Sequence, residues 1–149
     1  MTVHDSRSKV ASFLAYASPL RRRGFGEPYD EQVFQYFLSL ERRRAEQAKR
    51  PLLLALVSLQ VDMEPQRLSP RAGGRIFDGL AHCVREVDFI GWLRQDFVAA
   101  AVLVQGDAPE DASARVEERV TRAVYGRLPA DLHDSLRVQV KSLSPRARD

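Results

Sequence analysis

The fold is decided by one stretch of the chain, 51-PLLLALVSLQVDMEP-65. Its apolar run from Leu52 to Val61 is bounded by two prolines, and it is far shorter than the ~20 apolar residues that a membrane-spanning helix needs. A short run that is apolar at consecutive positions is typical of a strand buried on both faces. We therefore predict that residues 52–61 form the central strand of a sheet.

Periodic patterns on either side of this strand predict the other elements. Asp30 can cap a helix that ends before Pro51. Downstream we expect a helix over about 69–87 that starts at Ser69-Pro70, a hairpin of strands 89–93 and 97–104, a helix between Pro109 and Leu128, and an alternating edge strand over 136–141. This order predicts an α+β fold, a ferredoxin-like, antiparallel-containing sheet with helices packed on one face.

The first 27 residues are predicted to form an N-terminal helical extension of the domain at 28–149. Residues 6–18 have the spacing of an amphipathic helix, and 20–27 form a basic connector. Phe13 and Leu14 on the apolar side are candidate interface residues, which contact either a second chain or the chain's own domain.

Composition limits the class of protein. The 149 residues are enough for one core, and 44% hydrophobic with 29% charged residues is typical of a folded domain. A lone Cys83, which we expect in the core, and the lack of a secretory signal favour the cytoplasm. The arginine triplets at 21–23 and 42–44 are interpreted as solvated surface; without interleaved aromatics they do not predict nucleic-acid binding.

Three stretches carry a resemblance to a known family: 54-LALVSLQVD-62, 80-LAHCVREVD-88 and 89-FIGWLRQDFV-98. Across residues 28–143 the chain resembles the GGDEF (diguanylate cyclase) family. Members have an apolar-Asp-apolar-Asp strand, a helix running into Arg-x-x-Asp, and a hairpin bearing Gly-Gly-Asp/Glu-Glu-Phe. The resemblance implies a nucleotidyl-cyclase-like fold.

The family condenses two GTP molecules to cyclic di-GMP on two divalent ions held by carboxylates, and this chain departs from that chemistry. Gln60 stands at the first strand aspartate and Asp62 at the second. The turn reads Arg94-Gln95-Asp96-Phe97, one residue short and without glycines. We therefore predict an inactive domain with no catalytic residues, metal site or cofactor. An enzyme with a reshaped site at Asp62, Glu64 and Asp96 is the weaker alternative.

Arg85-Glu86-Val87-Asp88 matches the Arg-x-x-Asp motif at which family members bind cyclic di-GMP. Arginine can contact phosphate or guanine with two hydrogen bonds, and a nearby carboxylate can accept from guanine. Two interpretations stay open. Either Arg85 and Asp88 bind a nucleotide, or Asp88 pairs locally while Arg85 lies in solvent.

The leading hypothesis is a regulatory or scaffolding module that binds a protein partner or its own copy. Trp92 is either a packing residue of the hairpin or an exposed contact for that partner. The alternative is a non-catalytic receptor for cyclic di-GMP or GTP that uses Arg85 and Asp88.

Overall fold

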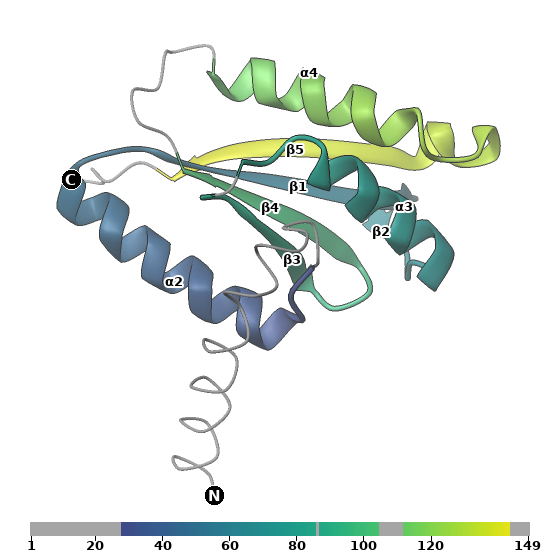
Figure 1. Ribbon diagram of the computed structural model, residues 1–149. Coiled ribbons are helices and arrows are strands. Elements are labelled where there is room, and N and C mark those ends of the chain that lie inside the picture. The colour runs from purple at the N-terminus through teal and green to yellow at the C-terminus, as the bar shows by residue number, and fades with distance from the viewer. Residues whose placement is uncertain (1–27, 86, 105–111, 144–149) are drawn as a thin grey trace, which may run out of the picture.

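One antiparallel sheet and three α-helices organise the part of the chain described by the computed structural model, residues 28–85, 87–104 and 112–143 (Figure 1). The predicted N-terminal helix lies outside these residues. None of the described helices is long and apolar enough to cross a membrane. In chain order the elements are α2 (Glu31–Ala48), β1 (Leu52–Val61), β2 (Glu64–Pro65), α3 (Pro70–Ala81), β3 (Phe89–Arg94), β4 (Val98–Val104), α4 (Ala112–Tyr125), a 3-10 helix η1 (Ala130–Ser135) and β5 (Leu136–Leu143).

β1 is the central strand of the sheet, as predicted. It pairs antiparallel with β4 from Leu52 opposite Val104, and with β5 from Leu52 opposite Leu143. β3 pairs with β4 on the far side, so β5 lies at one edge and β3 at the other. The predicted hairpin and the edge position of the last strand are both confirmed.

Helices cover both faces of the sheet, and the expectation of helices on one face only is wrong (Figure 1). Leu53, Ala55 and Val57 of β1 pack in the cluster beneath α3 and α4. The alternate residues Leu52 and Leu54 pack against Phe34 and Leu38 of α2 on the opposite face. The six consecutive apolar residues from Leu52 to Val57 require this, because successive side chains of a strand point to opposite faces.

Two predicted helix starts are confirmed, while the one near Pro109 lies outside the described residues, and one helix is shorter than expected. Asp30 accepts from the Val33 N–H at 3.0 Å and Ser69 accepts from the Ala72 N–H at 3.1 Å. α3 ends at Ala81 rather than near Val87, which is 55% exposed. After the helix, the His82 and Cys83 N–H groups bond three residues back, and the Arg85 N–H donates to the Asp88 carboxylate. Cys83 remains buried, as predicted, and burial raises the pKa of its thiol.

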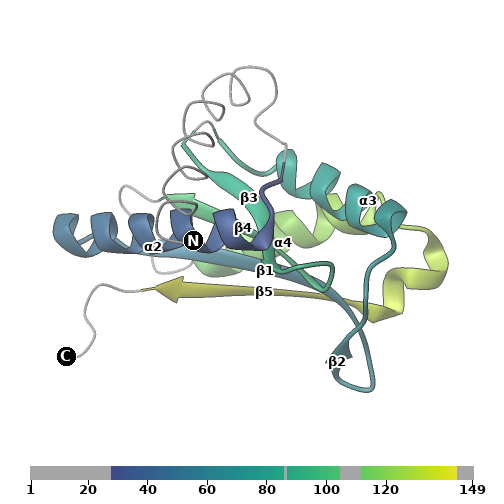
Figure 2. The same ribbon diagram turned by 90° about the horizontal axis from the view of Figure 1, so that it is seen from below.

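The short hairpin of β1 and β2 was not predicted. Val61 pairs with Glu64 across a two-residue turn, and this hairpin extends beyond the rest of the sheet (Figure 2). Both turn residues have positive φ, 56° for Asp62 and 67° for Met63. Such turns favour Asn-Gly or Asp-Gly, so the pair Asp62-Met63 does not predict a hairpin turn from the sequence.

Two glycines of α3 give opposite predictions. A Cβ on Gly79 would lie 2.8 Å from Val124 Cγ2 and 2.9 Å from its Cα, whereas one on Gly74 meets nothing within 4 Å. We expect Gly79→Ala to lower the free energy of unfolding by about 1–3 kcal/mol, because the helices must move apart. Gly74→Ala is the matched control, and helix propensity should raise that free energy by up to about 1 kcal/mol. Urea denaturation of both variants checks this; equal effects would contradict the packing.

Candidate functional site

The turn between β3 and β4 is where the resemblance places a catalytic loop. It is closed by the Phe97 N–H, which donates to the Arg94 carbonyl at 2.9 Å. Asp96 has a φ of 68°, a conformation that favours glycine, and the strand register shifts between Trp92 and Arg94. The backbone thus makes a tight turn even though both family glycines are replaced.

Gln95 ties this turn to the first residue of α2. The Glu31 N–H donates to Gln95 Oε1 at 3.0 Å, and the Gln95 N–H donates to Glu31 Oε1 at 2.8 Å. The exchange has the form of a capping box, but its members are 64 residues apart. Gln95 therefore satisfies a backbone donor at the start of the helix, where such donors have no partner within the helix.

Asp96 is tied to the segment that leads into α3. Its backbone carbonyl accepts from the Leu68 N–H at 2.7 Å, and its carboxylate lies 3.4 Å from Arg67 Nη2. The Arg94 guanidinium lies 4.3 Å from the centre of the Phe97 ring. Gln95 and Asp96 thus bond to the rest of the domain, whereas Arg94 and Phe97 contact each other within the turn.

The remaining positions of the family's metal centre do not fit a divalent ion. Gln60, at the end of β1, donates from its amide to Ser58 Oγ at 3.3 Å, and Asp62 lies in the turn beyond it. The only charge at the position of the hairpin carboxylate is that of Asp96, which already has a cation beside it. Across the residues that the structure describes, no three His, Cys, Asp or Glu side chains are grouped to hold a metal ion, so Asp62, Glu64 and Asp96 do not form a ligand set.

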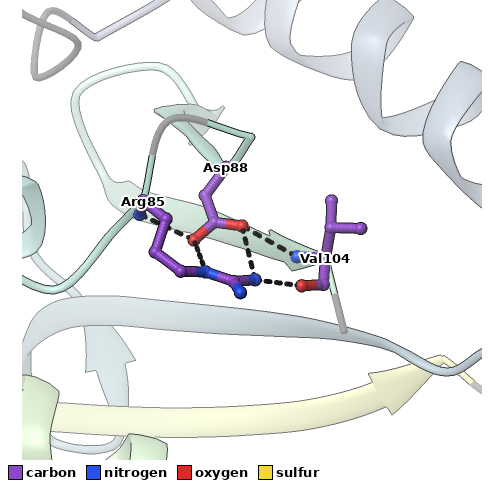
Figure 3. A network of polar contacts seen from close by, with 3 residues as sticks. All are labelled: Arg85, Asp88 and Val104. Carbon is purple, nitrogen blue, oxygen red and sulfur yellow. Dashed lines mark hydrogen bonds and ion pairs between the residues drawn. The ribbon is translucent and has the colours of Figure 1, made fainter. Parts of the chain in front are cut away.

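Asp88 is the centre of a polar network at the end of β4 (Figure 3). Its side chain is 0% exposed, and it accepts from the backbone N–H groups of Arg85 at 2.8 Å and Val104 at 2.9 Å. The Arg85 guanidinium lies 3.4 Å from the same carboxylate, is largely exposed, and also donates to the Val104 carbonyl. The carboxylate therefore has local partners on both oxygens.

Beside this network lies a hollow of about 530 Å³ that three arginines line, Arg85, Arg115 and Arg119. We call it the arginine hollow. Arg115 and Arg119 are four residues apart on α4, so they lie on one face of that helix. The four-residue spacing of Arg115 and Arg119 can be seen in the sequence, but no sequence pattern indicates that α4 lies beside Asp88.

Trp92 is half-buried on β3. Its ring packs edge-on against Phe77 of α3, with 4.9 Å between ring centres, and it lines a second hollow of about 540 Å³. Packing therefore accounts for part of its surface. The other candidate interface residues, Phe13 and Leu14, lie outside the described residues.

Comparison with solved structures identifies the fold. A DGC protein from Thermotoga maritima superposes with a TM-score of 0.58 at 21% identity, over 79% of this chain and 82% of that one. The GGDEF domain of YfiN (TpbB) from Pseudomonas aeruginosa gives 0.55 at 19% identity, over 79% and 73%. No protein-family model matches the chain, and no curated protein sequence matches it. The chain has the fold of a GGDEF domain, which confirms the predicted α+β, nucleotidyl-cyclase-like architecture.

A double-mutant cycle measures the contact between the turn and α2. We expect Gln95→Ala and Glu31→Ala each to lower the free energy of unfolding by about 1 kcal/mol, because each leaves a backbone N–H without its partner. The double variant should lose less than the sum by about 0.5–1 kcal/mol, since the two side chains act on one junction. Gln47→Ala, at an exposed position of the same helix, is the control. Strict additivity would show that the pair does not couple.

Proposed function

We propose that this chain is a catalytically inactive, GGDEF-like module that regulates or scaffolds through contact with a protein partner or its own copy. The module comprises residues 28–149, and residues 1–27 are an N-terminal extension whose Phe13 and Leu14 are candidate contacts. A cytoplasmic location fits this role. No metal or cofactor takes part in it.

The observation that supports this proposal is that polar residues of the β3–β4 turn are bonded within the domain. Gln95 and Asp96 direct their polar groups to Glu31, Arg67 and Leu68 of the same domain. A metal ion at Asp96 would compete with Arg67 for its carboxylate. A turn held in this way stabilises the domain and keeps its shape.

The chemistry of the reaction gives a second reason. Metal-assisted attack of a hydroxyl on an α-phosphate uses divalent ions that prefer carboxylate and phosphate oxygens. Gln60 contributes a neutral amide at one such position, and that amide bonds to Ser58. The site therefore lacks the negative charge that would offset two dications.

Two measurements on the purified chain test the proposal. With GTP and Mg²⁺ we expect no cyclic di-GMP above a protein-free blank by liquid chromatography. Gln60→Asp should also give none, because the charge it restores leaves the turn at 94–97 unchanged. In sedimentation velocity at increasing protein concentration, self-association that is lost in a Phe13→Ser, Leu14→Ser variant would assign the contact to a second copy.

Product formation by the natural chain would overturn the inactive assignment, and product formation by Gln60→Asp would show that a single carboxylate was missing. A natural chain that stays monomeric leaves a different protein as the partner. Residual nucleotide from purification is the main interference, so the protein is first treated with phosphatase and dialysed.

The arginine hollow favours a second candidate function, a receptor for cyclic di-GMP without turnover. Three arginines that line one opening suit a ligand with two phosphates, because arginine pairs with phosphate through two parallel hydrogen bonds. Asp88 is less suited to bind guanine than its motif implies, since its carboxylate is buried and has partners within the domain. Recognition would then depend on the arginines.

Calorimetric titration with cyclic di-GMP tests this candidate. If the hollow binds the ligand, Arg119→Ala should weaken binding about ten-fold, the equivalent of ~1.4 kcal/mol. Arg122→Ala, on the same helix and beside Glu118, should bind like the natural chain. A dissociation constant of about 100 µM corresponds to a binding free energy of about −5.5 kcal/mol. No heat at about 100 µM ligand would therefore rule out a receptor of useful affinity. Equal losses in both variants would mean nonspecific attraction.

A further inference from the structure

The two edges of the sheet differ in how far they are closed. At the β3 edge the Tyr29 N–H donates to the Ile90 carbonyl at 3.1 Å, and the Trp92 N–H donates to the Tyr29 carbonyl at 2.9 Å. The register of β3 with β4 also shifts between Trp92 and Arg94. A further strand would therefore have to displace Tyr29 and follow an irregular backbone to add to β3.

The outer side of β5, at the opposite margin of the sheet, has no such cover. β5 pairs with β1 without interruption, from Leu136 opposite Leu59 to Leu143 opposite Leu52. Within the part of the chain that the structure describes, no strand or bridge pairs with its other side, and Figure 2 shows β5 at the margin of the sheet. We call this side the β5 edge.

The backbone of the β5 edge is a regular template for a further strand. In an antiparallel pair, alternate residues turn their N–H and C=O groups away from the partner strand. β5 contains neither proline nor glycine, and its register with β1 has no shift. Its eight residues span about 27 Å. An extended segment can therefore form main-chain hydrogen bonds along this edge.

The side chains of β5 define which kind of segment would fit. Val138 and Val140 pack against the core cluster beneath α3 and α4. Arg137, Gln139 and Lys141 alternate with them, so they lie on the other face of the sheet, where all three are exposed. The strand therefore has cations at two positions four residues apart on one face, and it contains no carboxylate.

Neither cation of the β5 edge is paired with a carboxylate of the described residues. Arg137 donates to the backbone carbonyls of Asp134 at 3.2 Å and Leu136 at 2.9 Å, and Lys141 has no ion-pair partner in this part of the chain. Opposite charges that face each other across two strands stabilise the pair. Carboxylates on an added strand would therefore find both cations available.

A second copy of the same edge fits less well than an acidic segment. In a symmetric antiparallel pair centred on Gln139, Arg137 of one copy would lie opposite Lys141 of the other. Like charges directly opposite each other destabilise a strand pair, and lysine on an exposed edge is a known protection against self-pairing. Charge therefore favours a partner that differs from this chain.

We propose that the β5 edge binds an extended, acidic segment of a protein partner as an additional strand of the sheet. Carboxylates four residues apart in that segment lie opposite Arg137 and Lys141, and β-branched residues lie beside Val138 and Val140. Main-chain hydrogen bonds supply the affinity, and the two cations supply the specificity. This inference rests on the proposed function, because it names a surface and a partner class for a module that acts by contact.

A synthetic peptide, acetyl-TEVTVET-amide, tests the β5 edge because its two glutamates have the required spacing. Bound antiparallel, it would place them opposite Lys141 and Arg137. We expect about 2 mM peptide to slow amide hydrogen exchange about ten-fold at alternate residues of β5, as followed by nitrogen-15 NMR. Acetyl-TKVTVKT-amide, with lysines in place of the glutamates, is the matched control and should leave exchange unchanged. Sedimentation of each peptide alone verifies that it is monomeric.

A charge reversal tests whether the cations select the segment. Lys141→Glu should bind the acidic peptide about five-fold more weakly, because an attractive pair becomes a repulsive one, and should bind the lysine peptide more tightly than the natural chain does. Arg71→Glu makes the same change of charge at an exposed position of α3 and should bind like the natural chain. Far-ultraviolet circular dichroism verifies that both variants are folded.

Three outcomes would overturn the proposal. These are the absence of protection in β5 with the acidic peptide, equal protection by both peptides, and protection that grows with protein concentration without any peptide, which would assign the edge to a second copy. The proposed function fails separately, because product formation from GTP overturns the inactive assignment whether or not β5 binds a strand. Unprotected β5 amides in a chain that forms no product would remove this surface alone.

Discussion

β1 is hydrogen-bonded along both edges and buried on both faces, so it needs four sets of neighbours before it is stable. β4 and β5 supply the edges, α3 and α4 cover one face, and α2 covers the other. Removing any layer would expose an apolar side of a strand that has no polar side to present to water. The position of the β3–β4 hairpin follows from this, because β3 is held through β4.

The same arrangement turns the β3–β4 turn into a structural junction. α2 begins beside β3, because Tyr29, two residues before the helix, is hydrogen-bonded to Ile90 and Trp92 of that strand. A side chain at the turn can therefore reach the first residue of α2, and Gln95 does so. Glycines in this place would leave the helix start without that acceptor. Without glycines the backbone of the turn cannot approach a ligand as closely. In their place, Gln95 makes a contact with Glu31 that stabilises the domain.

The sequence predicts the elements whose causes are local. The two helix caps and the strand at 52–61 depend on residues close in the chain, and all were predictable. The predicted α3 is too long because Val84 and Val87 continue an apolar pattern, whereas the segment after Ala81 bonds to Asp88 through the Arg85 N–H. Because residues 52–57 of β1 are all apolar, the sequence does not reveal which helix covers which face. The pairing of Gln95 with Glu31 spans 64 residues and leaves no periodic pattern.

Asp88 has a structural role in this fold, because its carboxylate is buried and bonded within the domain. The Asp88 carboxylate accepts from the backbone N–H groups of Arg85 and Val104, so it joins the end of β4 to the segment after α3. Freeing it for a ligand would leave those donors unsatisfied, at a cost of about 1–3 kcal/mol for each. The Arg85 side chain is largely exposed and carries less of the fold. A nucleotide here would therefore be held through its phosphates by arginines, with little of the base selectivity that a free carboxylate provides.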